Sequence, residues 1–399
     1  MTRNNPPSSA PATVSAAATR WQAFALLRAG LWNTPVDATL FNGDTDWDAI
    51  TTFATRQTVA GLMAEAIGTL PAACQPTAPV MHKLRSMVSG TLRGHVLLNR
   101  TLVEVMELLR QNDIPAVLLK GQGVAMNYAV PTLRQCGDID FYVGHQHYSQ
   151  ACALATTWGV EQGSSSESDK HYHFHHAGVT VELHRIAERL PLPWRDARFQ
   201  RWTEKNLQGN CLRTVTIGGS QIQVPPINFD ALYIFNHAWH HFAAGGGIGL
   251  RQLCDWVRCL HTFRHEIDRN ELRCHLRNFG LWRPWHLFGC IAVDELGLPA
   301  EEFPFYTRRY ARQAIRMMDI IEEGGNFGFF HPTHTHRPDG YVAGKMHTFR
   351  KMHRHFGKLA LTCPTEMWPV WGRYLCVGIR QVITDQLQIK NRRCRSKRT

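Results

Sequence analysis

The stretch that decides the fold reads Gly-Asp-Ile-Asp-Phe-Tyr-Val and spans Gly137–Val143. Side chains of a β-strand alternate between its two faces, so Asp138 and Asp140 project from one face while the apolar residues between and after them face a core. Two carboxylates this close repel each other unless a cation lies between them. Because Mg²⁺ and Mn²⁺ prefer oxygen ligands, the pair predicts a divalent-metal site.

A third acid follows in Val179–His184, which alternates Val-Thr-Val-Glu-Leu-His. It is preceded by the strand-like run His171–His176, and the two residues between the runs have the length of a tight hairpin turn. The resulting register places His173 directly opposite Glu182. Since a third carboxylate commonly completes a two-metal site for phosphoryl transfer, Glu182 is the candidate. His173 and His184 lie on the same polar face and are candidates for proton transfer or acceptor contact.

A phosphate-binding turn is predicted at Lys120-Gly121-Gln122-Gly123, where the apolar, strand-like run Ala116–Leu119 passes into a short helix. Glycines allow the backbone to approach a phosphate closely, and a helix N-terminus supplies unpaired N–H groups. Lys120 adds a formal positive charge. Arg134, in the loop before the acid pair, is a candidate for bidentate contact with a triphosphate.

The segments on either side of this unit have helical periodicity. The apolar stripes are Ala23, Leu26, Leu27 and Leu31; Met81, Leu84, Val88, Leu92 and Val96; Leu102, Val105, Met106 and Leu109; and Phe229, Leu232, Phe235, Trp239 and Phe242. We therefore expect an α+β fold, with a small mixed-sheet core flanked by N-terminal and C-terminal helical regions. The expected division is a disordered leader at 1–19, helices at 20–113, the α/β core at 114–227, a helical domain at 228–388 and a basic tail at 389–399.

Composition narrows the functional classes. The chain has 399 residues, 44% of them hydrophobic and 19% charged, which supports a sizeable core and excludes wholesale disorder. The net charge of +12 suggests an anionic partner. The basic residues of Lys390–Thr399 could contact an anionic surface, although a disordered, solubilising end is the preferred interpretation. The eleven cysteines form no Cys-x-x-Cys pair, and no stretch suits a membrane span, so a reduced, cytoplasmic protein is expected.

These motifs, in this order, resemble the nucleotidyltransferase superfamily of the DNA polymerase β type, and more narrowly the bacterial family of uncharacterised nucleotidyltransferases. The resemblance rests on Lys120-Gly121, Arg134, Gly137-Asp138-Ile139-Asp140 and Val181-Glu182-Leu183-His184. Downstream it extends to a histidine-containing helix at His237–His241, to Leu250–Asp255 and to Gly325–Gly328. The Gly-Ser that binds phosphates in the wider superfamily is replaced here by Lys120-Gly121-Gln122-Gly123.

The resemblance implies transfer of a nucleoside monophosphate from an NTP, with ATP the expected donor, to an unidentified acceptor with release of pyrophosphate. Small molecules, sugars, peptides and RNA all remain open as acceptors. Mg²⁺, or Mn²⁺, is the implied cofactor. The expected metal-binding and catalytic residues are Asp138, Asp140 and Glu182, and the expected nucleotide-binding residues are Lys120, Gly121, Gln122, Gly123, Arg134 and Gly137.

Two alternatives stay open at this stage. One is a catalytically inactive module that retains the fold and nucleotide binding. The other is a histidine-metal hydrolase built on residues 171–184. His237 and His241 are spaced by four residues, as in metalloproteases, but no Glu stands beside His237, so the HExxH motif is absent. We interpret these two histidines as packing residues or as partners of Asp255.

Overall fold

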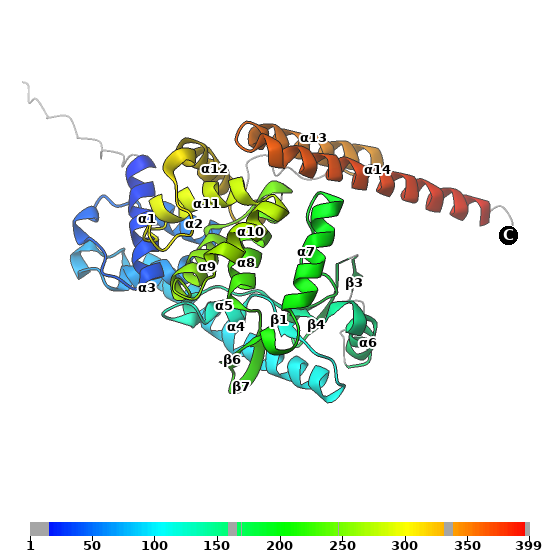
Figure 1. Ribbon diagram of the computed structural model, residues 1–399. Helices are drawn as coiled ribbons and strands as arrows, with labels where there is room; N and C mark the ends of the chain where they lie inside the picture. Colours follow the sequence, from blue (N-terminus) through cyan, green and yellow to red (C-terminus); the bar gives the residue numbers. More distant parts are fainter. Residues whose placement is uncertain (1–15, 159–165, 169, 246, 331–337, 396–399) are drawn as a thin grey trace, which may run out of the picture.

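The computed structural model describes residues 16–158, 166–168, 170–245, 247–330 and 338–395, and for residues 166, 167 and 381–395 it describes the backbone alone. Its centre is a five-stranded mixed sheet in the order β1-β2-β5-β4-β3, accompanied by a separate hairpin of β6 and β7 (Figure 1). The strands are β1 Val117–Leu118, β2 Asp138–Tyr142, β3 Ser166–Glu167, β4 His171–His176, β5 Val179–His184, β6 Arg213–Ile217 and β7 Ser220–Val224. The expected α+β class is confirmed.

The predicted hairpin forms with the predicted register. Ala177 and Gly178 join β4 to β5 with positive φ angles of 51° and 77°, as the two central residues of a type I′ turn require. His173 pairs with Glu182 across the two strands. Because β2 runs parallel to β5, Asp140 pairs with Glu182 on the other side.

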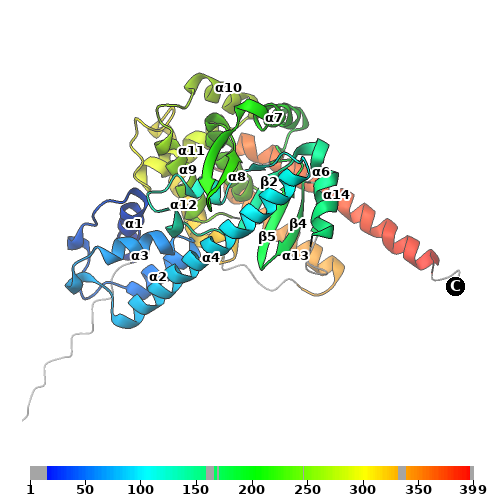
Figure 2. The same cartoon turned by 90° about the horizontal axis from the view of Figure 1, so that it is seen from below.

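The apolar face of the sheet packs against the C-terminal half of α4 (Ala78–Gln111), against α6 (Gly144–Thr157) and against the β6–β7 hairpin. Figure 2 shows α4 crossing the sheet. The prediction that Leu92 and Val96 continue the buried stripe is wrong, since they are 40% and 73% exposed. The buried face of α4 shifts round to His95 and Leu98 because its two ends pack against different cores.

The second core is helical and joins segments that are far apart in the sequence. Helices near the N-terminus and helices after the sheet bury their apolar side chains in one cluster. The helices outside the sheet region are α1 Ala16–Trp32, α2 Trp47–Arg56, α3 Ala60–Gly68, α7 Pro193–Asn206, α8 Ile227–Ala243, α9 Leu250–Thr262, α10 Arg269–Phe279, α11 Trp282–Asp294, α12 Ala311–Gly324, α13 Tyr341–Ala360 and α14 Pro364–Arg395. The polar face of the sheet is therefore turned toward a helical wall built from both regions.

The ends of the described chain differ from their predicted boundaries. Helix α1 already begins at Ala16, inside the predicted leader, and α14 continues to Arg395, inside the predicted basic tail. Residues 1–15 and 396–399 lie outside the described residues. Helix α14 lies beside α13 and its C-terminal part projects from the body (Figures 1 and 2). Among the helices described, none has the length and apolar character needed to cross a membrane.

Candidate active site

Three carboxylates converge on the polar face of the sheet. Asp138 and Asp140 come from alternate positions of β2, and Glu182 comes from the position on β5 that pairs with Asp140. One oxygen from each of the three lies within 4.8 Å of the others. Alternation along β2 and the parallel pairing with β5 are thus sufficient to assemble the acidic group predicted from the sequence.

Lys120 and His184 neutralise part of this charge. The Lys120 Nζ and the His184 Nε2 each lie 3.0 Å from Oδ1 of Asp140, and the same His184 nitrogen lies 3.1 Å from Glu182. Burial by itself would raise the pKa of Asp140, but Lys120 and His184 outweigh it and hold that pKa well below its ordinary value. The pKa of Asp138 is raised, chiefly by the charge of Asp140.

The donor set fits a divalent cation. Its carboxylate oxygens are the hard ligands that Mg²⁺ and Mn²⁺ require. The Asp140 Oδ2 is buried and has no hydrogen-bond partner in the described part of the chain. A buried carboxylate oxygen is costly unless it is paired or coordinates a metal. Asp138, Asp140 and Glu182 could therefore hold divalent ions between them.

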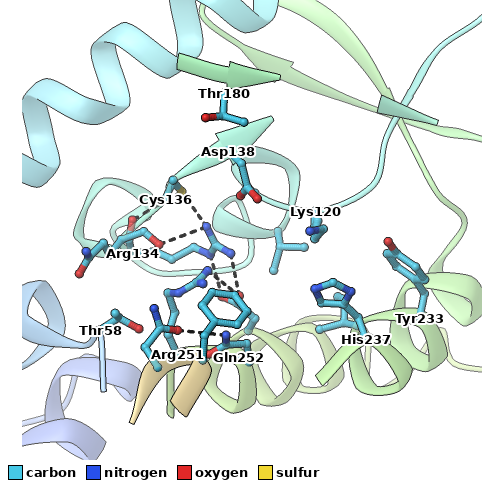
Figure 3. Close-up of a pocket in the computed structure, with 18 residues that line it drawn as sticks. Thr58, Lys120, Arg134, Cys136, Asp138, Thr180, Tyr233, His237, Arg251 and Gln252 are labelled. Carbon is cyan, nitrogen blue, oxygen red and sulfur yellow. Dashed lines mark hydrogen bonds and ion pairs between the residues drawn. The ribbon is translucent and has the colours of Figure 1, made fainter. Parts of the chain in front are cut away.

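Of the three acids, Asp138 lines a cavity of about 350 Å³ between the sheet and the helical wall (Figure 3), whereas Asp140 and Glu182 are not among the residues that line it. Its walls come from segments throughout the chain: Thr58, Lys120, Gly121, Val124, Arg134–Asp138, Thr180, Tyr233, Ile234, His237, Arg251, Gln252, Asp255, Asn326 and Phe327. Asp138 and Lys120 lie on the side of the sheet, while His237 and Arg251 lie on the helical side. The cavity therefore combines acidic and basic groups, as binding of a metal-nucleotide complex requires.

The predicted phosphate turn is only partly at the cavity. Gly121, with φ 64°, lines it, and an added Cβ would lie 3.2 Å from the carbonyl oxygen of Asp138. The predicted contacts by Gln122 and Gly123 do not match their placement, because neither residue lines the cavity. The Gln122 side chain is buried and donates to the Asn99 Oδ1 at 2.7 Å, while Gly123 packs closely against Val224. Gly137 does line the cavity.

Arg134 lies at the cavity wall but is held by a protein carboxylate. Its Nε and Nη2 donate to the two oxygens of Asp255 at 2.7 Å each, and its side chain is 3% exposed. Burial would lower the pKa of Arg134, but Asp255 outweighs it and raises that pKa well above its ordinary value. The guanidinium group that was expected to bind a triphosphate is thus paired with Asp255. Arg134 links the loop before β2 to α9 at the cavity wall.

Arg251 is a basic residue that motif reasoning did not single out for binding. It lies one helical turn before Asp255 on α9, at 3.7 Å from that carboxylate, and it lines the cavity. The spacing of Arg251 and Asp255 by four residues is the sequence signal, since such residues share a helix face. Because Asp255 is already paired with Arg134, Arg251 is the arginine better placed to meet an anionic ligand.

The two histidines predicted for proton transfer differ in their surroundings. His184 is buried between Asp140 and Glu182. Burial would lower its pKa, but hydrogen bonds to these two carboxylates raise it. His184 therefore bridges the two acids and holds them in place. His173 stands opposite Glu182 on β4, next to His171, whose Nδ1 lies 3.8 Å from Glu182.

His237 does not form the pairing with Asp255 that was one of its two predicted roles. It lines the cavity, but its partner is Glu188 rather than Asp255, with 3.2 Å between Nδ1 and the carboxylate. The predicted pairing fails because Asp255 already accepts hydrogen bonds from Arg134 and Tyr128. No motif marks Glu188, which follows β5 in a connecting loop.

Comparison with known proteins gives three results. No curated protein matches the chain. Among solved structures, an antigenic nucleotidyltransferase-like protein from Paracoccidioides brasiliensis matches with 15% sequence identity and a TM-score of 0.29, over 51% of this chain and 93% of that one. The family model described as "Uncharacterised nucleotidyltransferase" matches residues 43–296, well over half of the chain and including every candidate site residue named above. This protein belongs to the family of uncharacterised nucleotidyltransferases.

Proposed function

We propose that the protein transfers a nucleoside monophosphate from an NTP to an acceptor hydroxyl and releases pyrophosphate, with Asp138, Asp140 and Glu182 as the metal-binding residues. The observation that carries this proposal is the convergence of these three carboxylates, of which Asp138 lines a cavity that also holds basic groups. Membership of a nucleotidyltransferase family agrees with the reaction class.

In this proposal the basic residues contact the phosphates and the acidic residues bind the divalent ions. Lys120 and Arg251 would neutralise phosphate oxygens, and Gly121 lets the backbone approach them closely. Gly137, next to the acid pair, lines the same cavity. Divalent ions held by the acids would supply charge neutralisation and lower the pKa of the acceptor hydroxyl. Most of the rate enhancement in phosphoryl transfer comes from such positioning and electrostatic stabilisation.

The experiment is label transfer from each [α-³²P]NTP, ATP first, to a dialysed cell extract in the presence of Mg²⁺ or Mn²⁺. We expect transfer by the wild-type protein and its loss in Asp140→Asn, since the isosteric amide removes the charge that pairs Lys120 with the metal site. Asp44→Asn, the same exchange at an exposed residue that does not line the cavity, is the matched control. A folded Asp140→Asn protein with unchanged transfer would refute the assignment.

One observation favours a second candidate, the histidine-metal hydrolase. His171, Glu182 and His184 also bring ligand atoms within 4.8 Å of one another. Such a site would need His184 to give up its contact with Asp140, which the buried carboxylate opposes. Stoichiometric zinc in the purified protein, with no gain in activity from Mg²⁺, would favour this alternative. Nucleotide binding without turnover would favour the inactive module instead.

A further inference from the structure

A second buried carboxylate lies behind the cavity. The Glu188 side chain is 1% exposed, and it contacts Lys170 Nζ at 3.0 Å, His237 Nδ1 at 3.2 Å and His240 Nδ1 at 3.9 Å. Burial alone would raise the pKa of Glu188, but these three groups outweigh it and hold that pKa well below its ordinary value. Glu188 is therefore an anion in the protein interior.

This anion decides how the His237 imidazole is protonated. An ionised carboxylate can only accept hydrogen bonds, so the Nδ1 facing it must carry the proton. The other ring nitrogen, Nε2, then has a free lone pair, and it makes no hydrogen bond within the described residues. Burial, followed by the charge of Lys120, lowers the pKa of His237 to about 4, so the ring is neutral at neutral pH.

His237 lies where its Nε2 lone pair could accept a proton from a ligand in the cavity. The ring lines the same cavity as Asp138 and Lys120, and Figure 3 shows it close to Lys120 at one end. A carboxylate that orients a neutral imidazole beside a cavity is the arrangement of a general base and its supporting group. The charged and titratable groups around the ring include Glu188, Lys120, Lys170, Tyr233, His240 and His241.

We propose that His237 is the general base of the transfer reaction and that Glu188 is its positioning residue. The inference rests on the proposed function. In the step, the acceptor O–H bond breaks and Nε2 takes the proton, while the acceptor oxygen forms a bond to the α-phosphorus. The bond from that phosphorus to the bridging oxygen breaks, and its electron pair leaves with pyrophosphate. The imidazolium, stabilised by Glu188, then loses its proton to solvent.

The test measures transfer of [α-³²P]AMP from Mg-ATP to glycerol, used in large excess as the probe hydroxyl. In His237→Asn the amide still donates to Glu188 but offers no base. We expect kcat to fall about 100-fold or more, with KM for ATP changed less than about threefold. Glu188→Gln should also lower kcat at unchanged KM. His286→Asn removes a buried histidine on α11, outside the cavity, and should leave both constants unchanged.

Chemical rescue separates a base from a structural residue. In His237→Ala, added imidazole should restore part of the lost turnover, which a purely structural role would not allow. If His237→Asn does not fold, His237→Gln and the rescued alanine variant replace it. Full activity in His237→Asn, or loss in His173→Asn instead, would overturn the inference while leaving the function intact. No pyrophosphate release by the wild-type protein would overturn the proposed function, and the inference with it.

Discussion

The ion pair between Arg134 and Asp255 gives the sharpest prediction about the cavity wall. Both side chains are nearly inaccessible, at 3% and 8% exposure, and two 2.7 Å hydrogen bonds join them. Removing Asp255 leaves the Arg134 guanidinium buried without a counterion, and removing Arg134 leaves the Asp255 carboxylate with only the longer contact to Arg251, so each change costs ~3–5 kcal/mol. We therefore expect Arg134→Met and Asp255→Asn each to lower the free energy of unfolding by that amount, in urea titrations followed by tryptophan fluorescence at neutral pH.

The double variant Arg134→Met/Asp255→Asn should lose less than the sum of the two single changes, because neither member of the ion pair is then left buried without its partner. Arg251→Met is the comparison within the cavity. Arg251 is more exposed, and its contact with Asp255 is longer, at 3.7 Å. Removing Arg251 should therefore change the free energy of unfolding by less than ~1 kcal/mol while weakening Mg-ATP binding. If Arg134→Met lost less than ~1 kcal/mol and bound ATP poorly, Arg134 would be a nucleotide ligand and our reasoning from the buried pair would be wrong.

Three further predictions concern packing, ligand binding and pH. An added Cβ at Gly61 would lie 2.2 Å from the carbonyl oxygen of Leu133, so Gly61→Ala should lower the free energy of unfolding by ~1–3 kcal/mol in urea titrations. At Gly68 on the same helix an added Cβ meets nothing within 4 Å, so Gly68→Ala is the control and should not destabilise the protein. Mg-ATP at 100 times its Kd should stabilise the wild-type protein by ~2.7 kcal/mol in thermal melts, and Asp140→Asn should lose most of this; no shift in the wild type would contradict nucleotide binding. The pKa of His237 is about 4 in the folded protein and about 6.5 in the unfolded chain. Between these pH values the unfolded state therefore binds more protons, and the free energy of unfolding falls as the pH drops from about 6.5 toward 4. That contribution is about 2 kcal/mol between pH 7 and pH 5, and equal urea stability losses in the wild type and His237→Asn over this range would contradict it.

The sequence alone was enough to predict the features that depend on residues close together in the chain, namely strand alternation, the hairpin register and the helical stripes. The alternation of β2 and β5 follows from the side-chain period of a strand, and the register of β4 on β5 follows from a two-residue turn. The order of the residues along each strand is therefore enough to place Asp138 and Glu182 on polar strand faces. The periodic stripes likewise predicted α1, α4 and α8, because a helix that covers a core repeats its apolar residues at helical spacing.

The tertiary structure decided every pairing between distant segments. Asp140 meets Glu182 because β2 and β5 pair in parallel, while Arg134 meets Asp255 across 121 positions and Glu188 meets His237 across 49. These partners depend on how the sheet packs against helices from both ends of the chain, and no local pattern encodes that packing. Alternation places an acid on a face, but only the packed fold decides which cation neutralises it and which arginine and histidine remain available to a ligand.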